Sequence, residues 1–445
     1  MINLDGMQGI NEINYLMIDQ CNGLHDLSGL DNLTQCYSFK LTSNPNLVYL
    51  DGLSSLDEVT SIFTIDDNPK LADLTPLSSL STVSAFICAD NISLKDLSGL
   101  EGLDSISSIS IVGNDSITNF NGLQNLQHIR GSLRIERNIS LSNIDALIQL
   151  DTVNRVYIDS NLALPDLWGL SNLRVCGYGN YYGNLYIRHN NSLADLSDLG
   201  NLEKVNGPVV ISGNQGLLTL NGLNDLDSIN GYFLIHDNPS LFDIAHLDSL
   251  KYIEDHLEIV NNDSLADIPG FEALHHIGFD HYYGDYSLLI QGNENLYDIS
   301  GFNNLQSIYQ APVYIRSNAS LSLISGFNNL VSVGNVLGIE NNDSLADCSG
   351  FNSLVSISYL IIRDNYTLEG LQGFDSVQSM GSLKIENNTS FQDLDGLNSE
   401  LTINDYIFIL SNENLQNIEG LAGIETISFL TISENPSLIS LSRLD

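Results

Sequence analysis

The stretch Ile129-Arg-Gly-Ser-Leu133-Arg-Ile135-Glu-Arg-Asn138-Ile-Ser-Leu141 decides the fold, because close copies of it recur along the whole chain. Copies cover residues 205–217, 357–368 and 380–391. The full unit reads I-x-x-x-L-x-I-x-x-N-x-x-L-x-x-L-x-G-L-x-x-L. A fixed period of this kind indicates a stacked repeat architecture, in which each unit buries its apolar face against the next.

The Asn of each unit marks the period of the repeat. It occurs at Asn44, Asn68, Asn91, Asn114, Asn138, Asn161, Asn190, Asn214, Asn238, Asn262, Asn293, Asn318, Asn342, Asn365, Asn388, Asn412 and Asn435, with Cys21 in its place in the first turn. Most spacings are 23 or 24 residues, and two are 29 and 31. We therefore expect one continuous solenoid of 18 turns over residues 1–445, with loop insertions at 176–184 and 278–286.

Each position of the unit has a physical reason. In L-x-I, the alternation of period two turns Leu and Ile inward and predicts a short parallel strand in every turn. The Asn that follows can both donate and accept hydrogen bonds, which suits an inward ladder at a bend. The later apolar residues recur every three positions, which predicts a 3₁₀ stretch or a second bent wall. The fold class is thus a β-rich solenoid.

The segments GSLRIERNISLSNIDAL at 131–147 and GSLKIENNTSFQDLDGL at 381–397 resemble the repeat of the receptor L-domain, within the leucine-rich repeat superfamily. The resemblance extends over essentially the whole chain. It implies a right-handed coil with one long parallel sheet, on an extracellular or cell-surface protein that binds a ligand and has no catalytic activity. Animal L-domains are shorter and rich in disulfides, whereas this chain has only 5 Cys, which suggests a long microbial or protist type.

Composition excludes several other classes of protein. The chain has 15 Lys and Arg against 55 Asp and Glu, a formal net charge of -40, so nucleic acid is not expected as a partner. No apolar run is long enough for a membrane span, and the first residues lack the pattern of a signal peptide. Both ends fall inside a repeat, so we expect a fragment whose leader and anchor lie elsewhere, with end-to-end or flanking-domain contacts covering its open ends.

The two insertions, both rich in Gly and Tyr, are the best candidates for a binding site, because insertions on one side of a solenoid commonly mark its binding face. An apolar stripe of outward strand residues is expected beside them: Tyr157, Tyr186, Val210, Leu234, Glu258, Leu289 and Tyr314. The predicted ligand-binding residues are Tyr157, Tyr181, Tyr182, Tyr186, Leu234, Tyr282, Tyr283, Tyr286, Leu289 and Tyr314. Alternatively, the loop tyrosines fold onto their own turn, and the stripe reflects ordinary strand propensity.

A row of Asp recurs in the segment L-x-D-L of most turns, with Asn at positions 119, 143 and 417. Stacked like charges repel unless they are hydrogen-bonded or bridged by a cation. Asp243, Asp267 and Asp298 occupy three consecutive turns and are the candidate Ca²⁺ site. The other interpretation is that each Asp accepts a local backbone N–H in an Asx turn.

The cysteines, the clustered histidines and the glycosylation sequons can each be assigned to positions of the repeat or its insertions. Cys36, Cys88 and Cys348 stand at core positions, and only Cys176, at the root of the first insertion, is a candidate reactive thiol. The histidines at 275, 276 and 281 could bind a transition metal only if the loop around them fixed their geometry. Nine ladder Asn lie in N-x-S/T sequons, at 91, 114, 138, 190, 262, 318, 342, 365 and 388, and we expect burial to close them.

No catalytic motif such as G-x-S-x-G or H-E-x-x-H is present, so we expect a protein that is not an enzyme. The first functional hypothesis is an adhesion or recognition module that binds a protein or glycan through its strand face and Tyr-rich loops. The alternative is a structural surface-layer or fibre component, assembled by Ca²⁺ on the acidic flank.

Overall fold

The computed structural model describes residues 3–177, 182–278, 286–308 and 311–439. The chain divides into two compact units, Met1–Leu217 and Leu218–Asp445. Each unit is a parallel β-solenoid with almost no helix, which confirms the fold class predicted from the repeat. The predicted loop insertions and the continuity of the solenoid from residue 1 to 445 stay predictions.

Nine long strands of unit 1 carry the L-x-I segment. They are β1 (Glu12–Asp19), β2 (Gln35–Thr42), β3 (Glu58–Asp66), β4 (Thr82–Ala89), β6 (Ser108–Val112), β7 (His128–Glu136), β8 (Thr152–Asp159), β10 (Asn184–Arg188) and β12 (Val209–Ser212). Two-residue strands precede three of them: β5 (Ser105–Ile106), β9 (Val175–Cys176) and β11 (Lys204–Val205). Four short 3₁₀ helices lie on the far wall: η1 (Thr75–Leu77), η2 (Asp145–Leu147), η3 (Trp168–Leu170) and η4 (Ser197–Leu199).

Unit 2 is built in the same way. Its L-x-I strands are β14 (Phe233–His236), β16 (Leu257–Val260), β18 (Leu288–Gln291), β20 (Val313–Arg316), β21 (Ser332–Glu340), β22 (Ser356–Arg363), β23 (Ser379–Glu386), β24 (Thr402–Leu410) and β25 (Phe429–Ser433). The remaining elements are β13 (Ser228–Ile229), β15 (Tyr252–Ile253), β17 (His276–Ile277), β19 (Ser307–Ile308), η5 (Ser349–Phe351) and η6 (Glu419–Leu421). The six 3₁₀ helices of the described residues occur where the three-residue apolar spacing predicted them.

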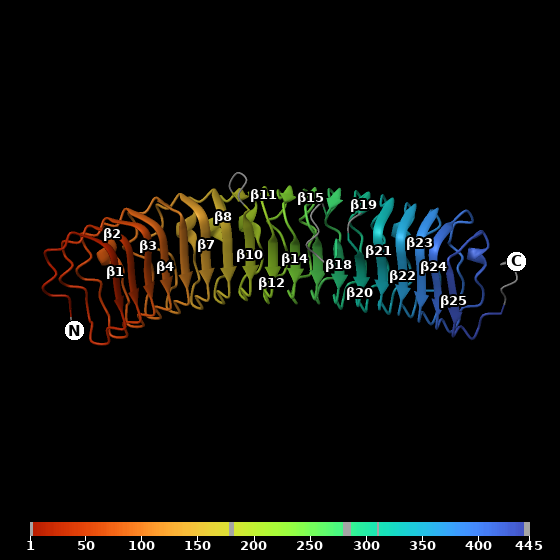
Figure 1. The fold of residues 1–445 in the computed structure, drawn as a ribbon, viewed down its shortest axis with the longest axis horizontal. Coiled ribbons are helices and arrows are strands. Elements are labelled where there is room, and N and C mark those ends of the chain that lie inside the picture. The colour runs from red at the N-terminus through yellow and green to blue at the C-terminus, as the bar shows by residue number, and fades with distance from the viewer. Residues whose placement is uncertain (1–2, 178–181, 279–285, 309–310, 440–445) are drawn as a thin grey trace. The chain divides into compact units, whose positions relative to one another are not determined.

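Within each unit, every long strand pairs in parallel with the next, so equivalent residues of successive coils lie side by side (Figure 1). In β7 and β8, for example, Leu133 is opposite Val156 and Ile135 is opposite Ile158. These four side chains are buried, while the residues between and after them point outward. The outward side chains of the long strands form what is called here the strand face.

The Asn ladder explains how each strand ends. The backbone N–H of Asn138 donates to Oδ1 of Asn161 in the next coil at 3.2 Å, and its Nδ2 donates to the carbonyl of Ile111 at 2.9 Å. In the first coil, the N–H of Cys21 donates to Oδ1 of Asn44 at 3.0 Å, as expected for a residue in the ladder position. Each ladder Asn from Asn44 to Asn412 is fully buried, and its hydrogen bonds offset the cost of desolvating an amide.

The residue before the ladder Asn turns the chain out of the strand. Arg137 and Ser160 take left-handed conformations there, with φ of 55° and 59°. This conformation is disfavoured for residues with a Cβ, so the ladder hydrogen bonds on the following Asn must hold it.

A column of aromatic rings fills part of the core of unit 2, which the repeat pattern did not predict. Phe271, Phe302, Phe327, Phe351 and Phe374 stack in consecutive coils, with ring centroids 4.9, 5.0, 5.3 and 5.5 Å apart. All five side chains are fully buried. In unit 1, Phe39 stacks on Phe63 in the same manner, at 5.0 Å.

Candidate functional site

Two of the predicted tyrosines meet on the strand face of unit 1. Tyr157 on β8 and Tyr186 on β10 are paired in register, and Val210 on β12 follows Tyr186. The two rings form an edge-to-face pair with centroids 5.4 Å apart and planes at 88°. Such pairs contribute roughly 0.5–1.5 kcal/mol beyond the area they bury, so the two rings hold each other in place.

Two arginines flank this tyrosine pair, and both are neutralised by neighbouring acids. The guanidinium of Arg134 lies 5.6 Å from the centre of the Tyr157 ring, and that of Arg188 lies 5.4 Å from the Tyr186 ring. Arg134 pairs with Glu136 at 2.7 Å, and Arg188 pairs with Asp159 at 2.8 Å. The result is an ordered, nearly neutral cluster of rings and ion pairs.

Unit 2 has a second cluster of the same composition. Tyr286 and Tyr314 form an edge-to-face pair at 5.6 Å, and the guanidinium of Arg316 lies 5.3 and 5.2 Å from the two ring centres. Arg316 donates from Nη2 to the Tyr286 hydroxyl at 3.2 Å and from Nε to Gln291 at 2.5 Å. Burial raises the pKa of Tyr314, with a further contribution from the charge of Glu340.

The absence of a side chain at Gly338 makes room for Tyr314. A Cβ added to Gly338, its register partner on β21, would lie 2.4 Å from two carbons of the Tyr314 ring. The ring therefore occupies the space that a side chain at position 338 of the next strand would fill. Together, these contacts hold Tyr314 in one orientation.

A carboxylate held between two imidazoles lies on the same face of unit 2. Glu258 contacts Nε2 of His236 at 3.1 Å and Nε2 of His256 at 3.4 Å. Burial alone would raise the pKa of Glu258, but the hydrogen bond from His236 and the charges of His236, His256 and Arg316 outweigh it and lower this pKa. His256 also stacks on Tyr232 at 5.2 Å. The histidines were missed in the sequence, although each follows or precedes an L-x-I segment on the outward side.

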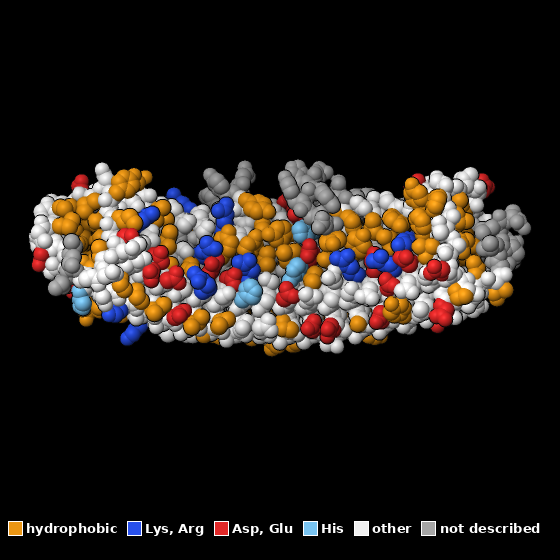
Figure 2. All heavy atoms as spheres, turned by 60° about the horizontal axis from the view of Figure 1, so that its bottom comes forward, with side chains coloured by type: hydrophobic (Ala, Val, Ile, Leu, Met, Phe, Trp, Pro, Cys, Tyr) orange, Lys and Arg blue, Asp and Glu red, His pale blue; other side chains and the backbone are white. Residues whose placement is uncertain are grey.

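The predicted apolar stripe is not evenly exposed. Val210 and Leu289 are only 8% and 5% accessible, whereas Leu234, Tyr157, Tyr186 and Tyr314 are half-buried. Figure 2 shows the hydrophobic side chains of the visible face gathered beside a row of basic and acidic ones. The accessible part of the stripe is thus its tyrosines and Leu234, whereas Val210 and Leu289 are buried.

The predicted loop residues divide into two groups. Tyr182 is described, and its side chain is 58% exposed. Tyr181, Tyr282 and Tyr283 lie outside the described residues, as do His281 and most of the two insertions. Their part in binding stays a prediction.

The Asp row accepts hydrogen bonds in most coils, as the Asx-turn interpretation predicts. The carboxylates that accept the N–H two residues later are Asp26, Asp73, Asp96, Asp166, Asp195, Asp243, Asp347 and Asp393. Asp267 and Asp298 instead accept the N–H and hydroxyl of Ser300 and Ser325 in the following coil. Within the described residues, no group of three or more acids, histidines or cysteines is arranged to hold a metal ion. Calcium binding by Asp243, Asp267 and Asp298 therefore stays a prediction.

Cys176 is not the reactive thiol that its position beside the first insertion suggested. Its side chain is fully buried, and burial raises the pKa of its thiol to about 12. Because the thiolate is the nucleophile, this group is inert in the folded unit. Cys88 and Cys348 have the same raised pKa and are buried as expected.

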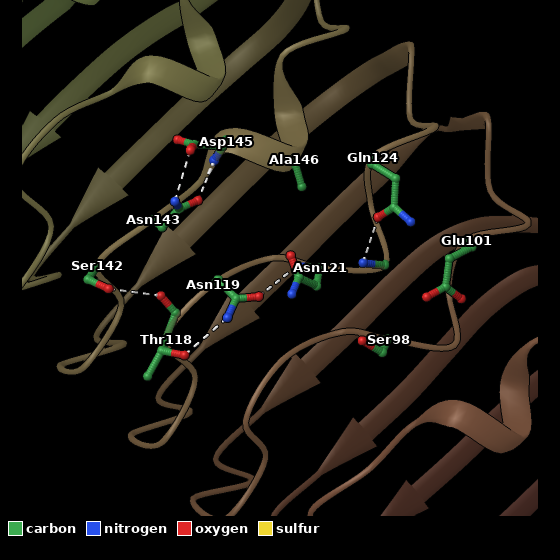
Figure 3. A pocket seen from close by; sticks show the side chains of 11 residues that line it. Ser98, Glu101, Thr118, Asn119, Asn121, Gln124, Ser142, Asn143, Asp145 and Ala146 are labelled. Atoms are coloured by element: carbon green, nitrogen blue, oxygen red, sulfur yellow. Dashed lines mark hydrogen bonds between the residues drawn. The ribbon is translucent and has the colours of Figure 1, made fainter.

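A polar groove opens on the wall of unit 1, away from the strand face. Side chains from three successive coils line it, as Figure 3 shows. They are Ser98, Glu101, Thr118, Asn119, Asn121, Gly122, Gln124, Ser142, Asn143, Asp145 and Ala146, around a volume of about 840 Å³. It is called here the amide groove. The signal for it in the sequence was the replacement of Asp by Asn at 119 and 143.

No helix within the described part of the chain is long and apolar enough to cross a membrane.

Comparison with known proteins finds one family model that matches part of unit 2. Residues 234–329 match the family model of the receptor L domain, a segment that includes Glu258, Tyr286, Leu289 and Tyr314. No curated protein matches the chain. An internalin from Listeria monocytogenes is similar at 16% identity over 98% of this chain and 84% of its own, with a TM-score of 0.26. A leucine-rich-repeat protein from Leptospira interrogans is similar at 12% identity over 85% of this chain and 91% of its own, with a TM-score of 0.29.

Proposed function

We propose that this receptor L-domain-like leucine-rich-repeat protein is a non-catalytic recognition or adhesion module of a cell surface. It binds a protein ligand on the strand faces of its two units. The observation that carries the proposal is the pair of tyrosine–arginine clusters, one in each unit, that are held rigid before any ligand arrives.

Rigid aromatic side chains are suited to this role. Tyr and Arg are, with Trp, the residues enriched where a few side chains supply most of the binding energy of a protein interface. A side chain that is already fixed loses little conformational entropy on binding. Tyr157 and Tyr186 in unit 1, and Tyr286 and Tyr314 in unit 2, are fixed by ring contacts and by the guanidinium groups over them.

Electrostatics favour a ligand of a particular kind. The net charge of -40 attracts a basic protein from a distance and speeds its encounter, and salt weakens this attraction. The ion pairs on the strand face, such as Arg188 with Asp159, then leave the contact surface close to neutral at short range. The match to the receptor L domain supports a protein rather than a small molecule as the ligand.

The test begins with binding of the chain to a panel of purified cell-surface proteins by surface plasmon resonance. For a protein that binds, we expect the pairs Tyr157→Ser with Tyr186→Ser, or Tyr286→Ser with Tyr314→Ser, to weaken affinity about 100-fold. This corresponds to roughly 2–3 kcal/mol, as for a lost interface anchor.

Two tyrosines of unit 1 and unit 2 that lie off the strand face provide the control. Tyr49 and Tyr297 are 50% and 58% exposed, and Tyr49→Ser with Tyr297→Ser should leave affinity unchanged. Equal losses for the control and the strand-face variants, with melting temperatures intact, would contradict the proposal. So would a ligand whose affinity none of these variants alters.

A further inference from the structure

We propose that the amide groove of unit 1 is a second binding site, separate from the strand face, and that it takes a neutral carbohydrate. Its lining comes from the segments that follow β4, β6 and β7, on the wall where the Asp row would otherwise run. Its volume of about 840 Å³ lies within the range of roughly 300–1,000 Å³ that is usual for small-ligand sites.

Charge distinguishes this groove from the wall on either side of it. The row position is Asp73 in the coil before the groove, Asp96 in the first coil that lines it, and Asp166 in the coil after it. In the two coils between, the same position is Asn119 and Asn143. Both keep the local turn, because their Oδ1 atoms accept the N–H of the residue two positions later, at 2.9 and 2.8 Å. The exchange therefore removes charge and adds N–H donors without changing the backbone.

Three lining side chains are held by hydrogen bonds that leave a further donor or acceptor for a ligand. Gln124 accepts the N–H of Gly122 at Oε1, at 2.8 Å, and its NH₂ has no partner among the described residues. Glu101 accepts the N–H of Gly99 at Oε2, at 2.9 Å, and its Oε1 is likewise unused within the described chain. Asn119 donates one N–H to the Thr118 hydroxyl at 3.1 Å, which leaves its second N–H.

This mixture of fixed donors and acceptors matches the chemistry of sugar hydroxyl groups. A hydroxyl both donates and accepts, so it can bond to an amide N–H and a carboxylate oxygen at once. Anchored side chains pay little entropy on binding. No aromatic side chain lines the groove, so recognition depends on hydrogen bonds and not on ring stacking. An anionic ligand would instead be repelled by Glu101 and Asp145.

The residues at equivalent positions of the neighbouring coil suggest the substitutions that test the site. Asn119→Asp gives this position the residue of Asp96, whose Oδ1 accepts the N–H of Ser98 at 2.9 Å. Gln124→Glu places a glutamate where the neighbouring coil has Glu101, which accepts the N–H of the equivalent glycine, Gly99. The double variant thus keeps both turns and removes the two free donors. The matched control is Asn417→Asp in unit 2, at the same row position and with the same bond, from the N–H of Glu419 at 3.0 Å.

The measurement is binding to an array of neutral oligosaccharides, followed by calorimetric titration with those retained. We expect the full chain to bind at least one of them, and the double variant to bind it at least tenfold more weakly with an unchanged melting temperature. Asn417→Asp and Tyr157→Ser with Tyr186→Ser should both leave this affinity intact. The last result separates the groove from the proposed strand-face function.

Two outcomes would overturn the proposal. One is that no neutral oligosaccharide binds. The other is that an oligosaccharide binds with the same affinity to the double variant as to Asn417→Asp, which would place its site elsewhere. Retention of acidic oligosaccharides or peptides by the groove, lost in the double variant, would assign it to a different class of ligand.

Discussion

At Glu258, a carboxylate stands in a row of otherwise apolar side chains, and its neighbours explain why it is tolerated there. Leu234 and Leu289 are its register partners on the adjacent strands. The imidazoles of His236 and His256 approach its two oxygens and replace the water that burial removes. Sequence alone shows an acid in an apolar row, but the histidines come from different positions of different coils, so their convergence needed the structure.

The lowered pKa of Glu258 predicts a dependence of stability on pH. A carboxyl group whose folded pKa is depressed stabilises the fold above its unfolded pKa, which is ordinarily about 4.3. That contribution is lost as pH falls through the folded pKa, where the folded group takes up its proton. We therefore expect the wild-type chain to exceed Glu258→Gln in stability at pH 6, with the difference shrinking as pH falls from about 5 to 3.

Urea unfolding at a series of pH values measures this difference. Other carboxyl groups titrate equally in both proteins and cancel in the comparison. A gap between wild type and Glu258→Gln that stayed constant or widened at low pH would show that the two histidines do not stabilise the carboxylate.

At the scale of elements, the five stacked rings of unit 2 fill the core position that leucines fill in the coils of unit 1. The glycine before each ring allows the close approach of coils. A Cβ on Gly326, for example, would lie 2.0 Å from the carbonyl oxygen of Gly301. The following Phe327 itself takes the left-handed conformation, with φ of 61°, whereas in a leucine coil the glycine takes it, as Gly52 before Leu53 does with φ of 105°. Packing of the rings therefore stabilises a strained left-handed conformation at Phe327, which the leucine coils avoid.

Removing one ring from the middle of the column tests this packing. Phe302 is fully buried between Phe271 and Phe327, at 4.9 and 5.0 Å. Phe302→Ala leaves a large cavity, and we expect it to lower the free energy of unfolding by about 3–5 kcal/mol in urea titrations followed by circular dichroism. Phe242→Ala removes a ring that is 56% exposed and should cost less than about 1 kcal/mol. Similar losses for the two variants would mean that the column does not stabilise unit 2.

The elements themselves were largely predictable, and the reasons are local. The alternation in L-x-I sets the strands, and the hydrogen-bonding capacity of Asn sets the ladder, so the 23- to 24-residue period was enough to place both. The splitting of strands, as in β5 and β6, was not predictable from the repeat pattern. The stacking of Phe271 on Phe302 was also missed, since the pattern treats Phe and Leu as equivalent.

At the scale of the molecule, the excess of 55 acidic over 15 basic residues destabilises the folded chain by electrostatic repulsion. The structure shows how part of this repulsion is relieved, since Asp267 accepts hydrogen bonds from Ser300 and Asp298 accepts them from Ser325. These contacts join neighbouring coils. A period read from sequence could align the acids but could not distinguish hydrogen bonding from cation binding, because both use the same oxygens.

Salt and calcium titrations separate those two possibilities. Since screening shortens the reach of the repulsion, we expect the melting temperature to rise between 20 and 200 mM NaCl. If the carboxylates are satisfied by hydrogen bonds, CaCl₂ should act like MgCl₂ at equal ionic strength, with no change in size on gel filtration. A calcium-specific rise in melting temperature or in oligomer size would instead support a fibre or surface-layer component, with Asp243, Asp267 and Asp298 as ligands.

The buried Asn ladder has a consequence for how the chain can be produced. Nine of its amides lie in N-x-S/T sequons, and all nine are 0% exposed, with no space for a sugar at Nδ2. Because the folded chain closes these sites, a glycan could be attached to them only before folding. A glycan on Asn138 or Asn262 would then break the ladder and hold two coils apart, so a eukaryotic secretory host should retain and degrade the product. A bacterial host, which leaves these sequons unmodified, is the appropriate source of the folded protein.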